Sequence, residues 1–200
     1  MSIIKTIGKI LLSLVLAIVL ASLATWYSFN SMHKTIEIGP WKTIIRDDSQ
    51  TGGIYHRFRN ADWGGGLRPS EALYFTTSTD SKGKRLSHAC TYHIEGHDPD
   101  SRWWSITAYT GSGSLIANPH HIYSISKTTV DRKSDGSWTV RLSRQKQLEN
   151  WIPLAAEDSA FSIILRCYVP STAFLDNPAD YPLPKIISEG CQRNFFAGSC

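Results

Sequence analysis

An uncharged segment near the N-terminus limits the folds open to this chain more than any other feature. Residues 10–27 begin at Ile10, end at Tyr27 and read ILLSLVLAIVLASLATWY, without a single charged side chain. A helix of this length is just long enough to cross the roughly 30 Å hydrocarbon core of a bilayer. A surface helix of a soluble protein would have a polar face, which this segment lacks. We therefore predict a transmembrane helix.

The residues around this segment predict its orientation. Lys5 and Lys9 precede it, and two aromatic residues close it. Lysines stay on the cytoplasmic side, and aromatic rings favour the membrane interface. We expect a single span in the inner (cytoplasmic) membrane with the C-terminal domain in the periplasm. A cleaved signal peptide is the alternative, because Ser22 and Ala24 suit a cleavage site, but the apolar run exceeds the usual signal core of roughly 7–15 residues.

The rest of the chain has the composition of an ordinary globular domain. Of the 200 residues, 42% are hydrophobic and 19% are charged, which predicts a packed core. The formal net charge is +4, and Lys and Arg are spread along the chain, so nucleic-acid binding is not expected. We expect three parts: a cytoplasmic tip and anchor at 1–30, a stalk and first strand at 31–50, and a β-rich domain at 51–200.

Short segments rich in aromatic and β-branched residues dominate the C-terminal part, separated by turn signals. The predicted strands are 72–77, 85–95, 103–110, 122–125, 128–132, 138–143 and 161–168. One short helix is predicted at 54–63, ended by three glycines. This pattern predicts a mainly β fold, an antiparallel β-sandwich or jelly-roll-like domain with an N-terminal transmembrane helix and one short helix.

Six short blocks recur in a characteristic order. They are EALYF at 71–75, RWWSITAY at 102–109, IANP at 116–119 followed by Tyr123 and Ser124, DGS at 135–137, NWIP at 150–153 and LRCYVP at 165–170. In these blocks the chain resembles the bacterial family known as domain of unknown function 1214. The resemblance implies the layout of the family's short members, a single span followed by this domain. It implies no activity, because none is established for the family.

Cysteine usage predicts a structural disulfide. The four cysteines are Cys90, Cys167, Cys191 and Cys200; disulfides persist in an oxidising compartment, and four cysteines allow three pairings. We favour Cys90 with Cys191, because Cys90 lies in a predicted central strand and the tail that carries Cys191 must be tied down to be ordered. Four reduced thiols are the alternative. A redox-active pair is not expected, because the Cys-x-x-Cys spacing is absent.

Neither a metal nor a cofactor is expected. His88 and Cys90 share one face of their predicted strand, whereas His93 faces away, so the three cannot converge on a metal. His93 with His97 is the least unsuitable pair for one. The glycine patterns that hold phosphates or dinucleotides are absent.

The polar residues of the family blocks are the candidates for a ligand site. The glycine-serine segment at 111–114 predicts a turn, because it lacks the order of a serine nucleophile motif. The ligand-binding candidates are Glu71, Arg102, Tyr109, Asn118, Asn150 and Arg166. Such groups bind an anion or a sugar when they line a cleft, and bond to one another when they are buried.

Tryptophans add a carbohydrate-stacking hypothesis. Adjacent Trp103 and Trp104 face opposite sides of their strand, so only one of them lies on any given surface and the other belongs to the core. We expect a non-catalytic binding or scaffold role in the cell envelope, with a protein or small-ligand partner that the sequence does not identify. The alternative is an envelope hydrolase or lyase acting on a sugar or small anion, with Glu71 and Arg102 in its site.

Overall fold

A computed structural model of the chain describes residues 2–31, 34–45, 67–155 and 159–191. The chain divides into two compact units, Met1–Lys34 and Thr35–Cys200. The helix predicted at 54–63 lies outside the described residues.

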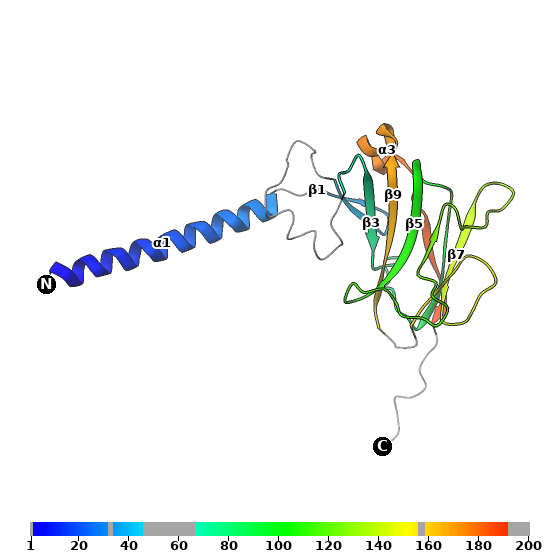
Figure 1. Ribbon diagram of the computed structural model, residues 1–200, viewed down its shortest axis with the longest axis horizontal. Helices are drawn as coiled ribbons and strands as arrows, with labels where there is room; N and C mark the ends of the chain where they lie inside the picture. The colour runs from blue at the N-terminus through cyan, green and yellow to red at the C-terminus, as the bar shows by residue number, and fades with distance from the viewer. Residues whose placement is uncertain (1, 32–33, 46–66, 156–158, 192–200) are drawn as a thin grey trace, which may run out of the picture. The chain divides into compact units, whose positions relative to one another are not determined.

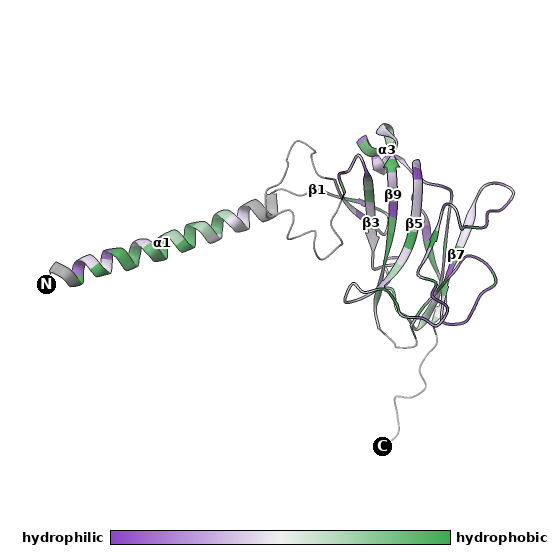
Figure 2. Ribbon diagram, viewed as in Figure 1, coloured by the Kyte–Doolittle hydropathy of each residue, from purple (hydrophilic) through white to green (hydrophobic). Residues whose placement is uncertain are grey.

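The first unit is one long apolar helix. Helix α1 (Ser2–Ser31) contains the 24-residue stretch Ile4–Tyr27, none of which is buried inside the protein. Hydrophobic residues make up most of the visible side of this helix (Figure 2). By length and composition it can cross a membrane, and it includes the predicted span at 10–27. A signal sequence has the same properties.

The second unit is a sandwich of two β-sheets (Figure 1). The six-stranded sheet has the order β1-β2-β3-β9-β5-β6, and the four-stranded sheet has the order β10-β4-β7-β8. The strands of the first sheet are β1 Lys34–Ile38, β2 Trp41–Ile45, β3 Ala72–Thr77, β9 Phe161–Pro170, β5 Ser101–Thr110 and β6 Ser124–Ser126. Those of the second are β10 Lys185–Cys191, β4 Cys90–Gly96, β7 Trp138–Ser143 and β8 Trp151–Pro153.

Two short helical turns, α3 (Thr172–Asp176) and η1 (Pro178–Asp180), connect β9 to β10. The prediction of a mainly β sandwich with a long N-terminal helix and one short helix is confirmed. The described short helix, α3, follows β9. Strand β8 is an exception to the antiparallel rule, because it pairs parallel to β7.

Alternating side chains of the two sheets build the core between them. On β9, Phe161, Ile163, Leu165 and Cys167 are all at most 2% exposed. Their neighbours Ser162, Ile164, Arg166 and Tyr168 face the other side of the sheet, as a period of two requires, and of these only Ile164 is buried. Of the two adjacent tryptophans, Trp104 is fully buried and stacks on a tryptophan of β7, which confirms that the pair faces opposite sides.

The predicted strand at 128–132 does not form. The backbone N–H groups of Thr129 and Val130 both donate to the carbonyl of Ser126, which makes a turn. The hydroxyl of Thr129 accepts from the N–H of Ser126 and closes that turn locally. A threonine that can satisfy its own turn in this way favours the turn over a sheet ladder, despite its high strand propensity.

Strand β10 joins the domain through β4. Cys191 lies opposite Cys90 in the register, and the two form a disulfide across a sequence separation of 101 residues. This is the pairing that the sequence favoured. Cys167 is a buried free thiol in the centre of β9. Burial raises its pKa from 9.0 to about 12.

Candidate functional site

Asn118 is hydrogen-bonded within its own loop. Its amide nitrogen donates to the carbonyls of Ile116 and Ile122, at 3.1 and 2.9 Å. Its amide oxygen accepts from the backbone N–H groups of His120 and Ile122, at 3.2 and 3.1 Å. These contacts use both donors and both lone pairs of the amide. The side chain therefore fixes the shape of the loop before β6.

Asn150 is also bonded to backbone. Its amide nitrogen donates to the carbonyl of Asp131, its amide oxygen accepts from the N–H of Asp131, and both distances are 2.7 Å. Asn150 has a φ of 43°, a left-handed conformation that asparagine tolerates better than most residues. The residue ties the loop before β8 to the loop before β7.

Two substitutions at Asn150 separate the contribution of its hydrogen bonds from that of its left-handed conformation. We expect Asn150→Ala to lower the free energy of unfolding by about 2–4 kcal/mol, because it loses two hydrogen bonds and strains a left-handed residue. Asn150→Gly loses the same bonds without that strain, so it should cost less by about 1–2 kcal/mol. Urea unfolding of both variants measures the difference. Equal losses in the two variants would show that alanine is not strained in the left-handed conformation at position 150.

Glu71 and Arg102 are exposed and lie on different segments. The carboxylate of Glu71 accepts from the backbone N–H of Arg68 at 3.2 Å, just before β3. Arg102 lies near the start of β5. Neither residue lines either of the two pockets described below. A shared site for Glu71 and Arg102, as in the enzyme alternative, therefore stays a prediction.

The remaining two candidates, Tyr109 and Arg166, do meet. They lie on adjacent strands β5 and β9, on the face of the six-stranded sheet that points away from the other sheet. The Arg166 guanidinium donates from Nη2 to the Tyr109 hydroxyl at 2.6 Å and from Nη1 to the Thr107 hydroxyl at 3.3 Å. Its central carbon lies 5.4 Å from the centroid of the Tyr109 ring, which adds a cation–π contact.

Aromatic residues surround Arg166 on the same face. The register places Tyr74 of β3 opposite Arg166, and two residues along the strands it places Trp103 opposite Tyr168. The rings of Trp103 and Tyr168 are 5.3 Å apart and tilted by 58°. Burial raises the pKa of the Tyr74 phenol, which is also hydrogen-bonded to the backbone of Leu67. We call Tyr74, Trp103, Thr107, Tyr109, Arg166 and Tyr168 the Arg166 face.

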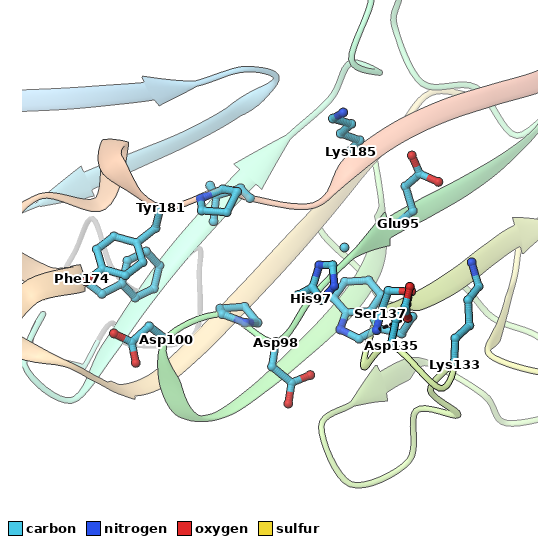
Figure 3. A pocket seen from close by; sticks show the side chains of 15 residues that line it. Glu95, His97, Asp98, Asp100, Lys133, Asp135, Ser137, Phe174, Tyr181 and Lys185 are labelled. Carbon is cyan, nitrogen blue, oxygen red and sulfur yellow. Dashed lines mark hydrogen bonds between the residues drawn. The ribbon is translucent and has the colours of Figure 1, made fainter.

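A pocket of about 590 Å³ lies at one end of the sandwich (Figure 3). It is built by the end of β4 and the loop after it, the turn before β7, and the segment from α3 to the start of β10. Its labelled side chains are Glu95, His97, Asp98, Asp100, Lys133, Asp135, Ser137, Phe174, Tyr181 and Lys185. Sequence reasoning did not find this pocket, because its three segments are far apart in the chain.

The acids of this end pocket are largely engaged by the protein. Asp98 accepts from Arg132 through both carboxylate oxygens, at 3.1 and 3.0 Å. Asp135 accepts from the hydroxyl and the N–H of Ser137, and these bonds lower the pKa of its carboxyl. Such turn contacts stabilise the loops. A second pocket, of about 670 Å³, lies around Arg141 and includes Asn150.

A family model described as "Protein of unknown function (DUF1214)" matches residues 71–172. The chain belongs to this family. All six predicted ligand-binding residues of this DUF1214 member lie within the matched residues, and so does the whole Arg166 face. The end pocket extends beyond them to Lys185.

Two solved structures resemble this DUF1214 protein over 64% of its length. The crystal structure of the VPA0106 protein from Vibrio parahaemolyticus is 25% identical in sequence, with a TM-score of 0.57. A putative uncharacterized protein from Burkholderia cenocepacia is 17% identical, with a TM-score of 0.43. The match covers 33% and 32% of those two chains, so this protein corresponds to about a third of each. No curated protein matches the chain.

Proposed function

We propose that this protein is a single-span envelope protein whose β domain binds a ligand or partner in the periplasm without catalysing a reaction. Two features support the location. Helix α1 is long and apolar enough to cross the inner membrane. The Cys90–Cys191 disulfide suits an oxidising compartment such as the periplasm, because reducing systems keep thiols free in the cytosol.

The Arg166 face is the observation that carries the binding role. It places a half-buried guanidinium among hydroxyl groups and aromatic rings on one side of a sheet. Arginine and tyrosine are enriched where proteins bind partners. Among the described residues, the groups that contact Arg166 are two hydroxyls and an aromatic ring, which suit the binding of a ligand.

Reporter fusions at the C-terminus test the topology. We expect an alkaline phosphatase fusion to be active and a fluorescent protein exported by the same route to be dark, because the domain follows a span whose lysines stay in the cytoplasm. The mass of the mature protein measures whether α1 is retained, as the anchor requires. A bright cytoplasmic reporter with an inactive phosphatase would contradict the proposed location.

A thermal-shift screen of the full-length protein in detergent tests the binding role. A ligand that binds the folded state raises the melting temperature by mass action. We expect at least one class of envelope metabolite or glycan to do so. A response by none of them would contradict ligand binding. A reaction product detected by mass spectrometry in the same mixtures would contradict the non-catalytic role.

A further inference from the structure

Arg166 has a positive charge that the described residues do not neutralise by an ion pair. Its two hydrogen-bond acceptors, Thr107 and Tyr109, are both neutral. The salt bridges of the described chain involve other cations, namely Lys42, His93, Lys127, Arg132 and Arg141. A half-buried charge without a counter-charge is costly. An anion bound at this face would remove that cost.

Arg166 has more N–H donors than its described hydrogen bonds use. A guanidinium has five N–H donors, and the contacts described here use two of them. The hydroxyls of Thr107 and Tyr109 accept from Arg166, and so their own hydrogens are directed elsewhere. Tyr74 keeps its phenolic hydrogen in alkaline solution because its pKa is raised. A surface rich in donors favours an anionic ligand.

The surface beside Arg166 suits a sugar ring. Trp103 and Tyr168 lie two residues along their strands from the Ser105–Arg166 pair, a spacing of roughly 7 Å. Rings of this kind present flat apolar faces against which a sugar can pack. Ser105 and Thr107 follow Trp103 on the same face of β5 and are both buried, so the half-buried side chains of Trp103, Tyr168 and Arg166 supply the accessible part of this face.

We infer that the Arg166 face binds an anionic saccharide, with its acidic group at Arg166 and an adjoining ring against Trp103 and Tyr168. This inference rests on the proposed binding function and adds the class of ligand to it. The planar fork of a guanidinium matches a carboxylate in two parallel hydrogen bonds. A uronic-acid oligosaccharide combines such carboxylates with rings at the required spacing.

Calorimetric titration of the full-length protein in detergent tests this inference with trigalacturonate and the neutral trisaccharide of galactose. We expect trigalacturonate to bind at least tenfold more tightly than the neutral sugar. Arg166→Gln should weaken trigalacturonate binding by about 10–100-fold and leave the neutral sugar unaffected, because a bond to a charged group is lost. Trp103→Ala should weaken both sugars.

Arg85→Gln is the matched control, because Arg85 is exposed and lies outside the Arg166 face. It should leave both affinities unchanged. Arg166→Lys retains the charge without the fork and should recover part of the binding. The melting temperature and the intact disulfide of each variant show that it is folded.

Three outcomes would overturn the inference. Equal affinity for the charged and neutral sugars would exclude recognition of the acid, and equal losses in Arg85→Gln and Arg166→Gln would show attraction by net charge alone. Binding of neither sugar, with a ligand of another class found in the thermal-shift screen, would exclude the saccharide and leave the proposed function standing. The proposed function itself fails separately, through a cytoplasmic reporter.

Discussion

Replacing both Cys90 and Cys191 with alanine is expected to lower the free energy of unfolding by about 4–5 kcal/mol. The disulfide closes a loop over a sequence separation of 101 residues, and a loop of that length restricts the unfolded chain by about this amount. Strand β10 depends on this link most, because Ile186 is its only buried residue. Guanidinium unfolding of the oxidised wild type and the double variant measures the loss.

The single variants provide the control for this prediction. Cys90→Ala and Cys191→Ala each break the same bond, so each should lose nearly as much as the double variant. Cys167→Ala leaves the bond intact and changes only a buried thiol. Additive losses in the two single variants would contradict a shared origin in the disulfide.

Raising the pH from 9 toward 12 is expected to lower the free energy of unfolding by up to about 4 kcal/mol. The pKa of the buried Cys167 thiol is raised from 9.0 to about 12, and a difference of about three units corresponds to that energy. Above pH 9 the unfolded thiol ionises, whereas the folded one keeps its proton. The contribution is therefore complete below pH 9 and is lost as the pH rises toward 12.

Two tyrosines with raised pKa values also lower the free energy of unfolding at high pH. Burial raises the pKa of Tyr74 and of Tyr92, whose hydroxyl accepts from the N–H of Ser87. Urea unfolding at a series of pH values should give a flatter profile for Cys167→Ala than for the wild type. If both profiles fall in parallel, ionisation of Cys167 does not cause the alkaline loss.

The sequence was sufficient where structure follows from local pattern. Helix α1 follows from an uninterrupted apolar run, and β7 follows from the alternation of Trp138, Val140 and Leu142, which are all fully buried. Strand β3 has the predicted bounds for the same reason. The sandwich class follows from many such strands, because each must bury one face against another layer.

Strands that depend on distant partners were not predictable. Strand β8 has only three residues, and its parallel pairing with β7 depends on the loop that Asn150 holds. Strand β10 lacks an alternating pattern, since its register shifts between Ser188 and Gly190. In both cases tertiary contacts, not intrinsic propensity, decide the conformation.

The candidate ligand-binding residues divide in the same way, between what local sequence predicts and what depends on distant partners. The polar side chains of Tyr109 and Arg166 made them candidates in the sequence. Their contact was not predictable, because only the register of β5 against β9 brings these residues, 57 positions apart, together. Asn118 and Asn150 have the same polar character, yet their bonds are with nearby backbone. Residue type alone cannot distinguish an amide that holds a loop from one that faces a ligand.

The position of β9 has a consequence for biosynthesis. It lies between β3 and β5 and pairs with both, so these earlier strands lack their common neighbour until residues 161–170 have left the ribosome. A nascent chain shorter than this cannot close the six-stranded sheet, and pairing between distant segments is slow in any case. Strands β3 and β5 therefore stay without this partner until the last part of the domain has been synthesised.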